Sequence, residues 1–100
     1  MEQDVTLNIH YSAPEEVWEK IGMVYRSMPY WKGYNPCPCW EEGDEISLTA
    51  SVEPGGIQIS GYMPDDIWES WYKELKDKLS DALEYTIGEP EDGFKFKYWD

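Results

Sequence analysis

Lysine and arginine are scarce in this chain of 100 residues, which contains 8 of them against 21 aspartates and glutamates and carries a formal net charge of −13. Binding to nucleic acid or to an anionic membrane requires cationic side chains that neutralise phosphates, so the composition disfavours both. It favours a cationic partner, whose approach the negative charge would accelerate. The alternative, that the acidity only keeps the protein soluble, stays open from composition alone.

The chain has only two cysteines, and it has no long apolar run. Cys37 and Cys39 are one residue apart, so they cannot cross-link distant parts of the chain as a disulfide framework would. No apolar run reaches the roughly 18 residues of a membrane span, and the acidic start MEQDVTLNIH is unlike a secretory signal. We expect a cytoplasmic protein without a cleaved leader, folded as one domain over residues 1–100 around a core rich in aromatic side chains.

Three segments show clear periodicity of apolar residues. Residues 4–11 alternate apolar and polar side chains, as a half-buried strand does. Residues 14–28 and 65–84 instead repeat apolar residues at steps of three and four, with Pro14 and Pro64 near their starts. The sequence therefore predicts one strand and two amphipathic helices.

Between and after the helices, further alternation predicts three more strands. Residues 46–52 and 57–59 flank a Pro-Gly-Gly turn and predict a hairpin, while residues 94–98 predict a last strand. An extra short strand over 85–87 stays open. The order β-α-β-β-α-β predicts an α+β fold of the ferredoxin-like split β-α-β type, in which a four-stranded antiparallel sheet carries two helices on one face.

The other face of that sheet is expected to be open, polar and largely uncharged. RNA-recognition domains of this topology stack bases on aromatic residues of their central strands, and such residues are missing from these positions. RNA binding is therefore disfavoured. The side chains expected on the open face are Thr6, Asn8, His10, Ser47, Thr49, Ser51, Gln58, Ser60, Lys95 and Lys97.

The motif Cys37-Pro38-Cys39 provides only two soft ligands, whereas a structural zinc site normally needs four and the chain has a single histidine, His10. The common redox motif has two residues between its cysteines and lies at the start of a helix. Here one residue separates the cysteines, and no helix is predicted to begin there. We expect two reduced cysteines, no metal and no cofactor.

Catalytic chemistry has no sequence signature either. Carboxylates are so numerous that no single acid–base pair is selected, and the acidic runs EEGDE and EPEDG do not reproduce a calcium-binding loop. His10 is not accompanied by a recognisable nucleophile motif. We predict no catalytic residue and expect that the protein is not an enzyme.

The segment PYWKGYNPCPCWEEGDE, residues 29–45, places aromatic residues beside a run of acids and outside the periodic elements. Tyrosine and tryptophan anchor many protein–protein interfaces, although here they could equally cap the core as a satellite cluster. If they are displayed, they form apolar anchors inside an acidic rim that suits a basic protein surface. The predicted partner-binding residues are Tyr30, Trp31, Tyr34, Trp40, Glu41, Glu42, Asp44 and Glu45.

Residues 52–99, with the segments EPGGIQISGYM and GEPEDGF, resemble small acidic uncharacterised bacterial proteins and, more loosely, the immunity proteins of polymorphic and contact-dependent toxin systems. The resemblance rests on general character and carries over no functional residue. Such immunity proteins are not enzymes; they bind a cognate toxin domain, frequently a nuclease, and block its active site. The resemblance implies the same role here.

The sequence thus predicts a non-enzymatic acidic protein that binds a basic protein partner, with an immunity protein for a nuclease-like toxin domain as the specific hypothesis. Trp31, Tyr34 and Trp40 are the expected anchors. The alternative is a small-molecule-binding or regulatory module that uses the open sheet face around His10 and Ser60.

Overall fold

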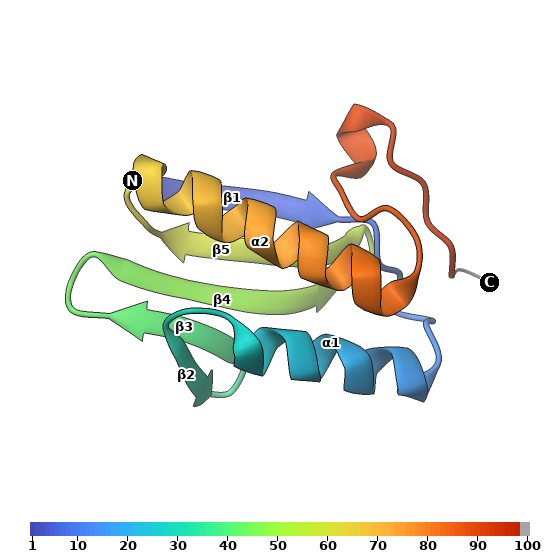
Figure 1. Ribbon diagram of the computed structural model, residues 1–100, viewed down its shortest axis with the longest axis horizontal. Helices are drawn as coiled ribbons and strands as arrows, with labels where there is room; N and C mark the ends of the chain where they lie inside the picture. Colours follow the sequence, from blue (N-terminus) through green and yellow to red (C-terminus); the bar gives the residue numbers. More distant parts are fainter. Residues whose placement is uncertain (99–100) are drawn as a thin grey trace.

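A computed structural model describes residues 1–98 of the chain and contains two helices, five strands and one 3₁₀ turn (Figure 1). The elements in chain order are β1 (Glu2–Leu7), α1 (Glu15–Ser27), β2 (Trp31–Tyr34), β3 (Pro38–Glu42), β4 (Ile46–Glu53), β5 (Gly56–Tyr62), α2 (Asp65–Leu83) and the 3₁₀ turn Pro90–Asp92.

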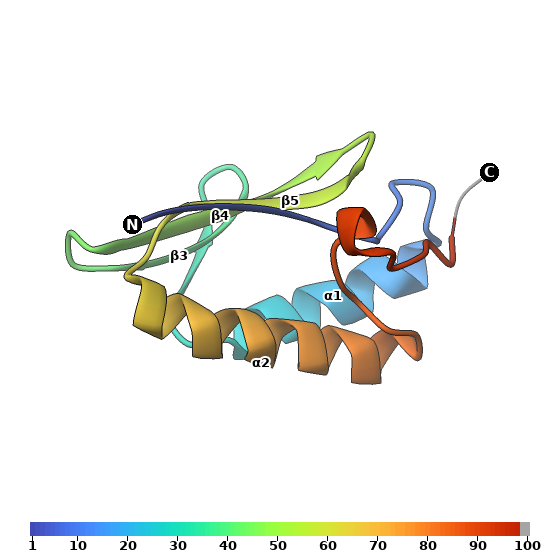
Figure 2. The same ribbon diagram turned by 90° about the horizontal axis from the view of Figure 1, so that it is seen from above.

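The strands form one antiparallel sheet in the order β1-β5-β4-β3-β2, and both helices cover the same face of it (Figure 2). The predicted α+β class is confirmed. The predicted four strands and ferredoxin-like order are wrong, because β1 lies at an edge of the sheet and the described chain has no strand after α2. The segment expected to be an aromatic loop supplies two strands, β2 and β3.

Both helices form where apolar residues recur at helical spacing, within one residue of the predicted bounds. In α1 the buried residues are Val17, Ile21, Val24 and Tyr25, and α2 buries a similar stripe from Trp71 to Leu83. Each helix follows a proline and has two carboxylates in its first turn, where the positive end of the helix dipole stabilises them.

The predicted hairpin of β4 and β5 is confirmed, and β5 lies between β1 and β4. Two glycines of β5 allow this close packing: Gly56 and Gly61 have positive φ angles, and a Cβ atom would overlap the carbonyl of Leu7 on one side and that of Ser47 on the other. Substitution of either glycine would therefore force the neighbouring strand away.

The predicted first strand over 4–11 ends early, at Leu7. The alternation of inward and outward side chains stops with it, because the N–H of Ile9 bonds to the carbonyl of Leu7 in a tight turn. Asn8 and Ile9 are consequently both buried, and Asn8 does not point to solvent on the open face as predicted.

Asn8 holds the segment that follows α2. Its Nδ2 donates to the carbonyls of Thr86 (2.9 Å) and Lys95 (2.7 Å), and its Oδ1 accepts from the N–H of Gly88 (2.9 Å). Its backbone N–H donates to the Gly88 carbonyl (3.0 Å), and the Tyr85 hydroxyl donates to its carbonyl (2.8 Å). Residues 85–87 and 94–98 are therefore held by a side chain and form no strand.

We predict that Asn8→Ala lowers the free energy of unfolding by about 3 kcal/mol, because it leaves the buried N–H of Gly88 and two part-buried carbonyls without partners. Urea denaturation measures the effect. Gln58→Ala is the control, since it removes only an exposed bond to Asp4 and should cost less than about 1 kcal/mol. Equal effects of the two substitutions would show that the Asn8 contacts do not hold the C-terminal segment.

Candidate binding surface at the acidic end

Trp40, one of the predicted partner-binding anchors, lies in the core and has no exposed surface. Its Nε1 donates to the Tyr25 carbonyl at 3.1 Å, and its ring makes edge contacts with Tyr25 and Trp71, each with 5.1 Å between ring centroids. The cause is the strand register: β3 pairs Trp40 with Leu48 of β4, whose side chain faces the helices. The prediction that Trp40 is displayed is wrong.

The other aromatic residues of the segment are more accessible. Tyr30 and Trp31 are half-buried against the core, whereas Tyr34 is 60% exposed and meets Trp31 edge-on at 5.4 Å between ring centroids. Tyr34 also lines a cavity of about 170 Å³ between α1 and the sheet, together with Trp18 and Tyr25. Of the three predicted anchors, only Tyr34 is largely free to contact a partner.

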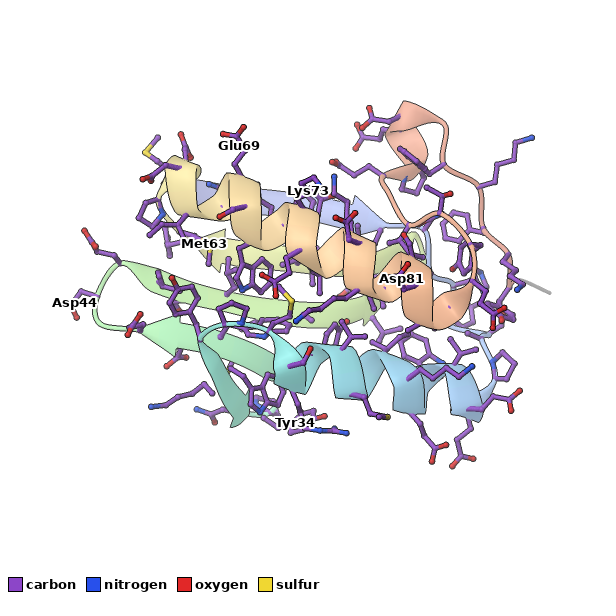
Figure 3. All side chains as sticks on the ribbon, viewed as in Figure 1. Tyr34, Asp44, Met63, Glu69, Lys73 and Asp81 are labelled. Atoms are coloured by element: carbon purple, nitrogen blue, oxygen red, sulfur yellow. The ribbon has the colours of Figure 1, made fainter. Side chains whose placement is uncertain are left out.

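The predicted acidic rim is displayed. Glu41, Glu42, Asp44 and Glu45 are all exposed at the end of β3 and in the turn to β4. Figure 3 shows Asp44 at one end of the molecule, near the end of the sheet that precedes α2. These side chains are therefore available to a partner.

At the same end, the chain adds carboxylates that the sequence did not connect with this rim. Asp44 and Glu45 share a shallow cleft of about 410 Å³ with Asp65 and Asp66 of the first turn of α2. Tyr62, at 58% exposed, and Met1, at 71% exposed, also line it. We call this surface the acidic end; its residues are Met1, Glu41, Glu42, Asp44, Glu45, Tyr62, Asp65 and Asp66.

The cationic residues are absent from the middle of the chain, where many of the carboxylates lie. Residues 33–72 contain eight carboxylates and neither lysine nor arginine. The ion pairs between described residues both lie in α2, where Lys73 meets Asp77 at 2.7 Å and Lys78 meets Glu74 at 2.8 Å. The carboxylates of the acidic end thus have no cationic side chain paired with them in the described chain, and they repel one another.

The two cysteines are free, with Cys37 half-buried and Cys39 buried. The Sγ of Cys39 donates to the Gly33 carbonyl at 3.4 Å. Burial, and then the nearby Glu41 carboxylate, raise the pKa of the Cys39 thiol, so this thiol is a poor nucleophile at neutral pH. Among residues 1–98, no group of three or more histidine, cysteine or acidic side chains is arranged to hold a metal ion.

The open face of the sheet carries the small polar side chains predicted for β4 and β5, including Ser47, Thr49 and Ser60. His10 does not join them. It lies beyond the end of β1, where its Nδ1 is 2.7 Å from the Ser12 hydroxyl and its ring stacks on Tyr11. The predicted Lys95 and Lys97 also lie outside the sheet, so His10 and Ser60 do not form a common site.

Within the described part of the chain, neither helix has the length and apolar character needed to cross a membrane. Comparisons with known protein families, curated proteins and solved structures find no match to this chain. The functional argument therefore rests on the geometry and charge of the acidic end.

The buried position of Trp40 predicts a large difference between two aromatic substitutions. Trp40→Ala should lower the free energy of unfolding by about 4 kcal/mol, because it removes a large core side chain. Tyr34→Ala should cost less than about 1 kcal/mol, because most of that side chain is in solvent. Chemical denaturation of both variants measures this; a small loss for Trp40→Ala would place its ring outside the core.

Repulsion at the acidic end predicts that neutralisation stabilises the free protein. Asp44→Asn with Glu45→Gln should raise the free energy of unfolding by roughly 0.5–1 kcal/mol at low ionic strength, and the gain should vanish near 1 M NaCl. Asp77→Asn is the control and should give no gain, since Asp77 is paired with Lys73. A loss of stability in the double variant at low salt would contradict uncompensated repulsion.

Proposed function

We propose that this protein is a non-enzymatic binding protein that recognises a basic surface of a partner protein through its acidic end. The observation that carries the proposal is the cleft that Asp44, Glu45, Asp65 and Asp66 line together with the exposed Tyr62. Its carboxylates come from two separate parts of the chain and have no cationic partner among the described residues. A cationic surface would remove their mutual repulsion on binding.

Charge and apolar contact have separate roles in this proposal. Unpaired carboxylates accelerate the encounter with a cationic protein, and this effect weakens as salt screens it. Tyr62 and Met1 provide apolar contact area inside the acidic rim, the arrangement that keeps a steered complex together. Tyr62 thus takes the anchoring role that the sequence assigned to Trp40.

The specific role we propose is that of an immunity protein for a cationic, nuclease-like toxin domain. A nuclease binds its substrate through cationic side chains that contact phosphates. A surface that presents several unpaired carboxylates can occupy the same cationic side chains and exclude the nucleic acid. The resemblance of residues 52–99 to immunity proteins supports this assignment.

One observation favours a second function, the binding of a small apolar molecule. The cavity between α1 and the sheet has aromatic walls from Trp18, Tyr25 and Tyr34, and its volume of about 170 Å³ suits a ligand the size of one aromatic ring. A small ligand bound there would raise the melting temperature with little dependence on salt.

The proposal predicts selective loss of binding when the acidic end is neutralised. The probes are catalytically inactive cationic nuclease toxin domains. The variant replaces four acids by their amides: Glu41, Glu42, Asp44 and Glu45. It should bind its cognate domain at least about tenfold more weakly than the unmodified protein does. Affinity of the unmodified protein should also fall steeply with added salt.

The matched control removes the same number of charges from the opposite end of the molecule, near Asp81 in Figure 3. It replaces Asp81, Glu84, Glu91 and Asp92 by their amides, and we expect less than about a threefold change. Equal weakening by both sets would assign the effect to net charge. Failure of every cationic domain to bind at low salt would refute the proposed function.

A further inference from the structure

Strand β1 is an edge of the sheet, and its pairing determines which backbone groups face outward. In an antiparallel pair, alternate residues exchange hydrogen bonds with the partner strand, and the residues between them point their N–H and C=O groups away. The N–H of Met63 donates to the carbonyl of Met1 at 2.8 Å, so the odd-numbered residues of β1 bond to β5. The residues with outward backbone groups are Glu2, Asp4 and Thr6.

The chain itself already uses this edge at its far end. Asn8 is next in the outward series, and its N–H donates to the carbonyl of Gly88 at 3.0 Å. The segment around Gly88 then leaves the edge, and no described backbone group pairs outward with Glu2, Asp4 or Thr6. An edge strand with free backbone N–H and C=O groups can pair with another chain, and on β1 the carboxylates of Glu2 and Asp4 restrict which chains can approach it.

Carboxylates lie on both sides of the exposed edge. Glu2 and Asp4 project from the open face of the sheet, since they are opposite Tyr62 and Ser60 of β5. On the helix face, the Nε2 of Gln3 donates to the Asp65 carboxylate at 2.9 Å and so ties β1 to the start of α2. Further carboxylates follow along α2 at Asp66 and Glu69, the latter labelled in Figure 3.

We propose that the edge of β1 receives an extended basic segment of the partner protein as a sixth strand. This inference rests on the proposed function and specifies how the basic partner binds. The outward groups of Glu2, Asp4 and Thr6 would supply the backbone hydrogen bonds, as in other cases of strand addition. Side chains of the added strand alternate between the two faces, and lysine or arginine would meet carboxylates on either.

Two other arrangements fit less well. A second copy pairing through β1 would bring Glu2 and Asp4 of both copies against each other, and like charges on paired strands are destabilising. The opposite edge, β2, has four residues, an irregular register between Trp31 and Gly33, and a cation at Lys32. A basic segment is therefore suited to β1 and not to β2.

The test uses a blocked peptide of about seven residues with lysine at alternate positions and threonine or valine between them. Amide hydrogen exchange followed by NMR reports on each residue of β1. In the free protein, Asp4 and Thr6 should exchange faster than Val5, whose N–H belongs to the set that faces β5. The peptide should slow exchange at Asp4 and Thr6 by at least about tenfold.

A protein variant isolates the backbone contribution. Thr6→Pro removes an outward N–H without removing a bond to β5 or a charge, and proline is tolerated on edge strands. It should weaken peptide binding by at least about tenfold relative to Thr6→Ala. If Thr6→Pro does not fold, the exchange measurement on the unmodified protein decides.

The two proposals can fail separately. Peptide binding without slower exchange at Asp4 and Thr6, or equal binding by Thr6→Pro and Thr6→Ala, would overturn strand addition. A cationic toxin domain that binds the acidic end and leaves these amides unprotected would also overturn it, while the proposed function stands. Absence of peptide binding at low salt would overturn the edge site alone.

Discussion

The packing of Trp40 is the interaction on which the arrangement of this molecule depends. Its ring lies between α1, α2 and β2, in contact with Tyr25, Trp71 and Trp31, and its indole N–H bonds to the backbone of α1. This fixes β3 in the sheet and leaves the two residues after Trp40, both glutamates, at the surface. Because the core buries Trp40, the exposed surface at the end of β3 is formed by the carboxylates of Glu41 and Glu42. The same burial raises the pKa of the Tyr25 hydroxyl.

The acidic end joins parts of the chain that are distant in sequence: the start of β1, the turn between β3 and β4, and the start of α2. The dipole of α2 stabilises Asp65 and Asp66, whereas Asp44 and Glu45 lie in the turn between β3 and β4, away from a helix N-terminus. The repulsion lowers the stability of the free protein, and the proposed cationic partner would remove this cost on binding. The adjoining edge of β1 is exposed because, among residues 1–98, the C-terminal segment pairs with its outward backbone groups at Asn8 alone.

Periodic segments could be predicted from the sequence, and aperiodic ones could not. Both helices and the hairpin of β4 and β5 follow from their apolar spacing. Strands β2 and β3 were missed because an irregular register at Gly33 and three prolines hide the alternation that their pairing would otherwise produce. The alternation of residues 94–98 was misleading, because a hydrogen bond from the Asn8 side chain holds that segment. The exposure of the four rim acids could be predicted from the sequence. Their proximity to Asp65 and Asp66 could not, because it results from tertiary packing and no local sequence pattern indicates it.

The central claim is that a cationic protein binds at the acidic end and the adjoining edge of β1. NMR mapping of the isotope-labelled protein with a cognate, catalytically inactive cationic nuclease domain tests it most directly. The account predicts that the shifted backbone resonances cluster in residues 1–6, 41–45 and 62–69. Shifts that instead surround the cavity lined by Trp18 and Tyr34, or the segment after α2, would contradict it.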